Sequence, residues 1–220
     1  SAVVYGRFSR AFMIRRSTLF SALLVGSTLA HAQTWTGITN TRTASSSVAM
    51  LLTDGSVLVH SVNSANWSRF KPDSSGNYLN GTWSSVASMV STYKPTYYAS
   101  AVLPDGRVVV VGGEYINNSA VWSATGAIYD PLGNTWATLS NPLGWTSMGD
   151  AQCAVLNDGR FMVARPQNTA SAILDPNTLT WSAAGTGKLD RHNEESWCLL
   201  KDGSVLTVDI LNAPHAEKFV

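Results

Sequence analysis

Three side chains that could hold or transform a polar ligand occur at one repeated position of this sequence. Tyr97, Asp150 and Glu194 each lie eight residues before the aspartate of an Asp-Gly pair, and Ser46 has the same position before the first pair. A phenol and two carboxylates can hydrogen-bond a ligand. Two carboxylates can also share the acid and base roles of glycoside hydrolysis when they lie about 5 to 10 Å apart. The equal spacing predicts a recurring structural unit that presents these side chains in equivalent places.

Cationic and aromatic side chains accompany that position. The cationic or imidazole groups are Arg42, Lys94, Arg191 and His192, and the nearby rings include Tyr98, Tyr115 and Trp122. Apolar sugar faces stack on aromatic rings while hydroxyl groups bond to polar side chains, so this mixture favours a sugar or peptide ligand. The candidate ligand-binding residues are Arg42, Lys94, Tyr97, Asp150, Arg191, His192 and Glu194.

The elements that must position these residues are indicated by the Asp-Gly pairs themselves, at 54, 105, 158 and 202. Each pair lies between two apolar, β-rich runs, and Asp-Gly supplies the positive φ angles of a tight hairpin turn. Each unit is therefore expected to begin with two antiparallel strands. The eight expected strands cover 45–52, 56–60, 98–103, 107–112, 152–156, 160–164, 196–200 and 204–208.

A second recurring piece predicts two more strands in each unit. Tyr129-Asp130-Pro131 is followed by Trp136, and Leu174-Asp175-Pro176 is followed by Trp181. Proline cannot donate to a strand ladder, so a third strand should end there and a fourth should start at the tryptophan. In the first unit the same piece is stretched from Phe70 to Trp83. Four strands per repeat of about 45 to 50 residues are typical of propeller blades.

One unit resembles a complete kelch repeat, because Val108 to Val111 is followed by Gly112-Gly113, then by Ala127 to Pro131 and Trp136. The other units lack the Gly-Gly pair, so the resemblance is degenerate and covers residues 38–220. It implies an all-β, kelch-type β-propeller with about four blades of an incomplete ring, which would be the front part of a longer protein. The expected blades are 38–90, 91–143, 144–188 and 189–220, the last without its outermost strand.

The resemblance also implies where the chemistry lies. In kelch propellers the segments that enter the innermost strands, and the loops between second and third strands, open on one face where ligands bind. The candidate residues fall in those segments, whereas the four Asp-Gly turns would lie on the opposite face as turn chemistry. The tryptophans at 83, 136 and 181 would pack between neighbouring blades.

The leading functional hypothesis is a non-enzymatic module that binds or scaffolds a protein or glycan partner. A galactose-oxidase-like copper oxidase is one alternative, because Tyr97 matches the register of that enzyme's cofactor tyrosine. Ser46, however, stands where the cysteine linked to that tyrosine would be needed. A glycan hydrolase is another alternative, and in both cases missing blades would supply further site residues. No cofactor and no metal site is expected from this chain alone, and open blade edges could cause self-association.

The first 32 residues predict export. Arg15 and Arg16 precede an apolar run from Leu19 to Leu29 that ends in Ala30-His31-Ala32, the pattern of a signal peptide with Gln33 as the mature start. Residues 1–12 would be upstream read-through, and the paired arginines leave a twin-arginine signal open beside ordinary secretion. We therefore expect a secreted or periplasmic protein without a membrane anchor.

Charge and cysteine content set two further limits. The chain has 15 basic and 14 acidic residues, and four arginines but no acid precede Gln33, so the remainder is mildly acidic. This balance argues against nucleic-acid binding. The two cysteines, Cys153 and Cys198, could be free thiols or, in an exported protein, a disulfide.

Overall fold

The computed structural model describes residues 33–220, of which 36–220 form one compact unit. The expected signal peptide and the residues before it lie outside the described range. Within that range, no helix is both long enough and apolar enough to cross a membrane.

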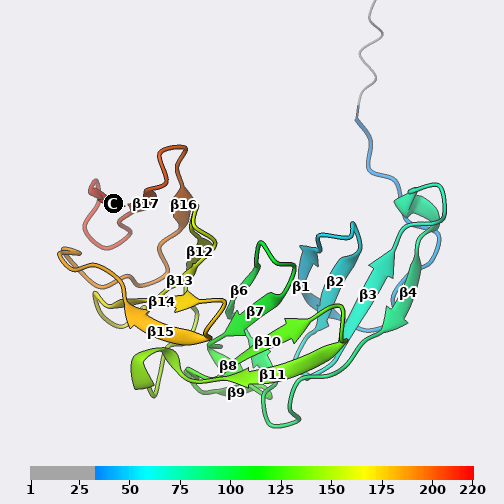
Figure 1. Ribbon diagram of the computed structural model, residues 1–220, viewed down its shortest axis with the longest axis horizontal. Helices are drawn as coiled ribbons and strands as arrows, with labels where there is room; N and C mark the ends of the chain where they lie inside the picture. The colour runs from blue at the N-terminus through cyan, green and yellow to red at the C-terminus, as the bar shows by residue number, and fades with distance from the viewer. Residues whose placement is uncertain (1–32) are drawn as a thin grey trace, which may run out of the picture. The chain divides into compact units, whose positions relative to one another are not determined.

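The compact unit is a succession of antiparallel sheets (Figure 1). The first sheet has the order β1-β2-β3-β4, formed by Ser46–Leu51, Val57–Ser61, Trp67–Lys71 and Thr82–Ser85. The second has the order β6-β7-β10-β11, formed by Ala99–Val102, Val108–Val111, Gly126–Asp130 and Thr135–Leu139. The third, β12-β13-β14-β15, comprises Cys153–Val155, Phe161–Ala164, Ser171–Asp175 and Thr180–Ala183. The fourth, β16-β17-β18, comprises Trp197–Leu199, Val205–Val208 and Ala216–Phe219.

The expected hairpins are present, but their turns differ in one respect from the prediction. Gly55, Gly106, Gly159 and Gly203 have positive φ, whereas the preceding aspartates do not. In the first hairpin the Gly55 N–H donates to the Leu52 carbonyl, and the Leu52 N–H donates to the Ser56 carbonyl. This is a three-residue loop in which only the last residue is left-handed. The aspartate instead accepts the backbone N–H two residues later, as Asp54 does from Ser56 at 3.0 Å.

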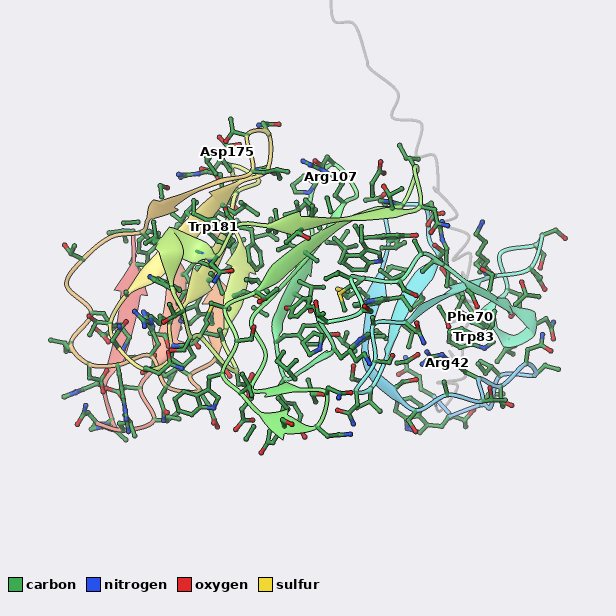
Figure 2. The ribbon with its side chains drawn as sticks, turned by 90° about the horizontal axis from the view of Figure 1, so that it is seen from below. Arg42, Phe70, Trp83, Arg107, Asp175 and Trp181 are labelled. Carbon is green, nitrogen blue, oxygen red and sulfur yellow. The ribbon has the colours of Figure 1, made fainter. Side chains whose placement is uncertain are left out.

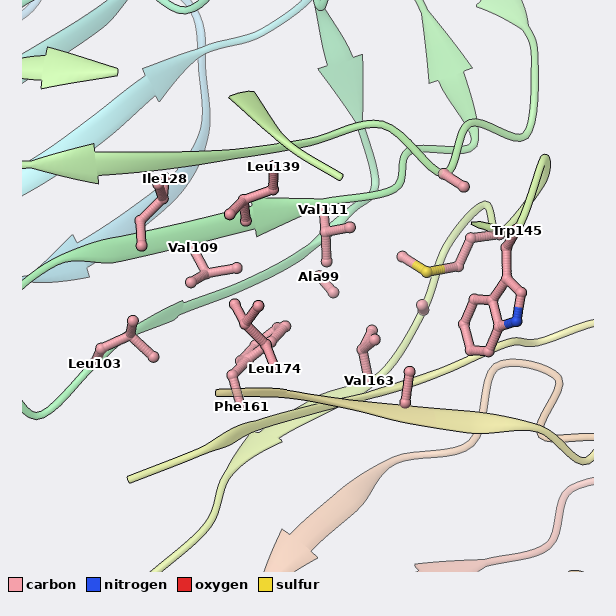
Figure 3. Packing of buried hydrophobic residues seen from close by; sticks show 14 residues of the cluster. Ala99, Leu103, Val109, Val111, Ile128, Leu139, Trp145, Phe161, Val163 and Leu174 are labelled. Carbon is pink, nitrogen blue, oxygen red and sulfur yellow. The ribbon is translucent and has the colours of Figure 1, made fainter. Parts of the chain in front are cut away.

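The second strand of the second sheet explains how neighbouring sheets pack. All four valines of β7 are buried, and because successive side chains of a strand point to opposite faces, both faces of this sheet must be covered. Val108 and Val110 lie in a cluster with residues of the first sheet. Val109 and Val111 lie in a second cluster with Phe161, Val163 and Leu174 of the third sheet (Figure 3). Each middle sheet is therefore buried on both faces, as propeller blades are.

Each fourth strand carries a tryptophan that ties its sheet to the segment before it. The Trp136 indole N–H donates to the Ala87 carbonyl at 2.9 Å, and the Trp181 indole N–H donates to the Ser140 carbonyl at the same distance. Trp83 makes the equivalent bond to Asn40, and Arg42 lies over its ring (Figure 2). These tryptophans are structural, as the sequence predicted.

A small sheet and two short turns were not predicted. The sheet, β5-β8-β9, consists of Pro95–Thr96, Tyr115–Ile116 and Ser119–Ala120 and belongs to the loops of the second sheet. The turns are the 3-10 helices η1 (Tyr78–Asn80) and η2 (Pro142–Gly144). Cys153 and Cys198 are both free, and Cys198 is exposed.

Candidate functional site

Loops of the second, third and fourth sheets line one cleft, which we call the Trp122 cleft. Its volume is about 240 Å³. The second sheet contributes loop residues that follow β7, and the third contributes the segment before β12 and the β13–β14 loop. The segment before β16 completes it. The lining residues are Glu114, Trp122, Asp150, Pro166, Gln167, Arg191, Asn193 and Glu194.

The Gly112-Gly113 pair brings the second and third sheets together at this cleft. A Cβ on Gly112 would lie 2.7 Å from the Gly149 carbonyl oxygen and 2.6 Å from the Met148 methyl group, so only glycine fits. The Gly113 N–H donates to the same carbonyl at 3.0 Å. The Trp122 indole in turn packs against Gly149, where a Cβ would lie 3.2 Å from the ring. This close approach places Asp150 next to Trp122.

Amide contacts fix the other side of the cleft. The Gln167 side-chain N–H donates to the Met148 carbonyl at 2.7 Å, while its buried oxygen has no hydrogen-bond partner in the protein. The Asn193 N–H donates to the Pro166 carbonyl at 2.8 Å, and the His192 N–H donates to the Asn168 carbonyl at 3.0 Å. The segment that carries Arg191 and Glu194 is therefore held on the β13–β14 loop.

The cleft is acidic and has an open aromatic face. Glu114, Asp150 and Glu194 are carboxylates, and Arg191 is the one cationic side chain among the lining residues. Burial raises the pKa of Asp150, and the nearby charge of Glu194 raises it further. The Trp122 side chain is 52% exposed. A protonatable carboxyl beside a second carboxylate can donate or accept hydrogen bonds, and the exposed indole offers a stacking surface.

A largely buried ionic network holds the segment before β16, residues 188–195, in place. Lys188 contacts Asp190 at 2.9 Å and Glu195 at 3.2 Å, and it also pairs with Glu217 of β18. Burial lowers the pKa of Lys188, but the hydrogen bonds that its ammonium group donates to Glu217, Asp190 and Glu195 outweigh burial and raise the pKa above its ordinary value. The Thr207 hydroxyl donates to Glu195 at 2.8 Å. The network joins residues 188–195 to β17 and β18.

Of the seven candidate residues, the structure brings Asp150, Arg191 and Glu194 together. Lys94 lies outside the cleft lining, and its carbonyl accepts the Asn117 N–H. His192, a candidate ligand-binding residue, is buried with its ring edge-on to Trp197. Its pKa is lowered to about 4, first by burial and then by the Lys188 charge. His192 therefore does not line the Trp122 cleft but a separate pocket of about 120 Å³, where neither ring nitrogen has a hydrogen-bond partner among the described residues.

Arg42 and Tyr97 belong to the first sheet and its junction with the second. Arg42 donates to the Ser46 hydroxyl at 2.7 Å and also bonds Ser61. Tyr97 is 58% exposed and lines a shallow hollow with Ser46. Tyr97 and Ser46 are therefore close together, as the comparison with a copper oxidase required, but Ser46 has a hydroxyl where the thioether link needs a thiol. These residues do not fit a thioether-linked tyrosine cofactor.

The loops that the sequence analysis expected on one face do line the Trp122 cleft, but several of the lining residues were not among the candidates. Glu114, Trp122 and Gln167 lie in the loops between second and third strands that were expected on the ligand face, and Asn193 lies between two selected residues. Of these residues, only Trp122 could have been recognised from its residue type, because an aromatic ring in a loop is a possible stacking surface for a ligand. His60 is a fully buried residue of β2, within the strand expected at 56–60.

Comparisons with known proteins concern the fold. No family model and no curated protein matches the chain. Solved structures do match, among them the "Structure of YjhT", with a TM-score of 0.57 and 15% identity over 75% of this chain. The chain spans 57% of that protein's length. YjhT is a kelch-repeat propeller protein, and the present chain likewise has the all-β fold of a kelch-type propeller, with four successive blades.

Proposed function

We propose that this protein is a glycan-binding propeller and that the Trp122 cleft is its binding site. The observation that carries the proposal is an exposed indole beside three carboxylates, one guanidinium group and two amides in a cleft of about 240 Å³. A sugar ring presents an apolar face and a rim of hydroxyl groups. The indole suits the face, and the carboxylates and amides suit the rim.

Charge narrows the class of glycan. Three carboxylates outnumber Arg191 in the cleft, so a uronic or sialic acid would meet repulsion from like charges. Neutral sugars and sugars with an amine are favoured for the same reason. The buried, unpartnered oxygen of Gln167 is an acceptor that a hydroxyl or amine could satisfy.

Isothermal titration and indole fluorescence with cello-, chitosan- and oligogalacturonate fragments test the proposal. We expect binding of the neutral or amine-bearing oligosaccharides and weakening by at least tenfold in Trp122→Ala. Leu132→Ala is the matched control, because Leu132 is 95% exposed in the turn that follows β10. Equal affinity in wild type and Trp122→Ala, or preference for the oligogalacturonate, would reject this site.

A second candidate function is glycan hydrolysis at the same cleft. It is favoured by the raised pKa of Asp150 next to Glu194, since a general acid must hold its proton near neutral pH. Reducing-end assays on the bound oligosaccharides would measure it. Activity should be lost in Asp150→Asn and in Glu194→Gln and retained in Asp130→Asn. Binding of the oligosaccharides without release of reducing ends would reject hydrolysis and leave glycan binding as the proposed function.

Export belongs to the same proposal, because a glycan-binding protein meets its ligands outside the cytoplasm. The leader-like residues before Gln33 support it. Sequencing the N-terminus of the protein recovered from the periplasm or medium should give Gln33, and a cytoplasmic protein that retains Met13 would contradict it.

A further inference from the structure

Four carboxylates meet where the segment before β16 contacts the ends of β17 and β18. Asp190, Glu195 and Glu217 share the ammonium group of Lys188. Asp209, which directly follows β17, joins them, because one carboxylate oxygen from each of Asp190, Glu195 and Asp209 lies within 4.8 Å of the others. Four negative charges therefore face one positive charge.

These charges are largely withdrawn from water. The side chains of Asp190 and Glu217 are 16% and 17% exposed, and that of Glu195 is fully buried. Asp209 is 2% exposed. A buried charge is tolerated when it is paired or bound to a metal ion. One ammonium group cannot balance four such carboxylates, so the cluster requires further positive charge.

Asp209 marks the place where that charge is needed. Its Oδ1 accepts the backbone N–H groups of Leu211 and Asn212 at 2.9 and 3.0 Å. Its Oδ2 is buried and has no hydrogen-bond partner among the described residues. Lys188 pairs with the other three carboxylates but, among the described side chains, not with Asp209. Because the turn occupies Oδ1, Oδ2 is the atom left to face Asp190 and Glu195, and a buried oxygen without a partner points to a ligand.

The ligand atoms available around this position are oxygens. The Thr207 hydroxyl donates to Glu195 at 2.8 Å and keeps its lone pairs, and the Asn212 amide contacts Asp190. Ca²⁺ binds carboxylate, hydroxyl and amide oxygens at about 2.3 to 2.6 Å in a flexible geometry, whereas Mg²⁺ demands shorter distances and a stricter octahedron. Three oxygens within 4.8 Å of one another can surround one calcium ion with small side-chain shifts.

We propose that Asp190, Glu195 and Asp209 form a calcium site, in which the ion supplies the positive charge that Lys188 alone does not. The ligands come from two separate segments, so the ion fastens the segment before β16 to the end of β17. No metal site was expected from the sequence, because acidic residues at these separations form no recognisable ligand motif. The inference is independent of what the Trp122 cleft binds.

The ion orders a segment that also lines the Trp122 cleft. Arg191 and Glu194 belong to the cleft lining and lie between the ligands Asp190 and Glu195 in the sequence. Calcium holds this segment on one side, and hydrogen bonds to the β13–β14 loop hold it on the other. Without calcium, repulsion among the carboxylates loosens residues 188–195 first.

Calorimetric titration of the chelator-treated full chain with calcium tests the site. Wild type should bind one ion with a dissociation constant of about 1 mM or tighter. Asp209→Asn should raise that constant at least tenfold. Asp202→Asn is the matched control, because Asp202 also accepts the N–H two residues later but is exposed. No calcium binding in wild type, or an equal loss in the two variants, would overturn the proposal.

Thermal unfolding separates loss of the ion from loss of folding. Calcium at about 100 times its dissociation constant should raise the Tm of wild type by about 5 °C or more, because a ligand of the folded state stabilises it. Asp209→Asn should lose this rise. In EGTA the variant should be at least as stable as wild type, since it keeps the Oδ1 acceptor and removes a crowded charge. Lower stability of Asp209→Asn in EGTA would show that the carboxylate acts through protein contacts and would contradict the site.

Two further measurements locate the ion. Calcium should slow trypsin cleavage after Lys188 and Arg191 at least fivefold in wild type and should not slow it in Asp209→Asn. Unprotected cleavage in calcium-loaded wild type would contradict the location. Loss of calcium binding in Asp150→Asn, with binding kept in Asp209→Asn, would place the ion among the carboxylates of the Trp122 cleft and reject the proposed ligands.

Discussion

His60 shows how a single buried side chain can make this fold sensitive to acid. Its Nε2–H donates to the Ser64 carbonyl at 2.9 Å, and its Nδ1 accepts from the Ser47 and Tyr98 hydroxyls at 2.9 and 2.8 Å. The neutral ring is thus fully bonded, and protonation at Nδ1 would break two of these bonds. Burial lowers the pKa of His60 to about 4, as it does for His192.

Because both histidine pKa values are depressed in the folded state, their contribution to stability is present above the unfolded value of about 6.5. It is lost as the pH falls from there towards about 4. We expect the free energy of unfolding, measured in urea, to decrease steadily between pH 6.5 and 4. His60→Gln should flatten that slope, whereas His215→Gln, at an exposed position, should not. A constant free energy across this window would contradict the prediction.

Gly112 is the residue at which backbone conformation and close packing coincide. Its φ is +91°, and an added Cβ would collide with Gly149 and Met148. Gly112→Ala should lower the free energy of unfolding by about 2 kcal/mol or more and weaken ligand binding at the Trp122 cleft. Gly144→Ala separates the two causes, because Gly144 has φ +71° but open space around it. Gly144→Ala should lower the free energy of unfolding by less than Gly112→Ala does. Equal decreases would show that close packing at Gly112 contributes nothing.

The tryptophan of each fourth strand links its blade to the preceding part of the chain, because its indole N–H donates to a backbone carbonyl there. Trp136→Phe keeps an aromatic ring but removes the donor to the Ala87 carbonyl. We expect a loss of about 1 kcal/mol in the free energy of unfolding, the usual net value of one hydrogen bond. Trp122→Phe removes an exposed indole N–H and should change the free energy by less than about 0.5 kcal/mol. A similar loss in both variants would refute the role of the hydrogen bond.

The hairpins could be predicted from sequence because their determinants are local. Asp-Gly and the apolar runs beside it lie within a few residues of each other, so all eight predicted strands are observed with bounds that differ by no more than one residue. The β5-β8-β9 sheet escaped prediction because two-residue strands carry no periodicity and depend on contacts between distant loops.

The candidate site was harder to predict because it also depends on contacts between loops that are distant in the sequence. Asp150 and Glu194 occupy the same position in two neighbouring blades, so both lie at the same end of their blades and line one cleft. Residue type alone does not report burial, so the sequence did not show that His192 is buried beside Trp197 and away from the Trp122 cleft. Arg42 was chosen for its charge, and in the structure it hydrogen-bonds Ser46 and Ser61 and lies outside the Trp122 cleft.

For the whole molecule, the Lys188 network determines how firmly the fourth blade is attached. Glu195 has a fully buried side chain that would be left with an uncompensated charge in Lys188→Met. Removing one partner of a buried ion pair costs about 3 to 5 kcal/mol. We expect that loss in denaturant unfolding, with new protease cleavage within 186–195. Lys201→Met, at an exposed position, is the control, and a loss below about 1 kcal/mol in Lys188→Met would contradict the prediction.

The small β5-β8-β9 sheet has a consequence for how such a protein could diversify. It is an elaboration of the loops of the second blade at the end that carries the Trp122 cleft, yet the strands of that blade keep the same order and turn as the other blades. Stability resides in the paired faces and in the Asp-Gly end, so the other end is free to accept insertions. Protein engineers could therefore randomise the exposed residues 117–121 as a recognition loop while leaving the scaffold unaltered, much as they vary the binding loops of antibodies.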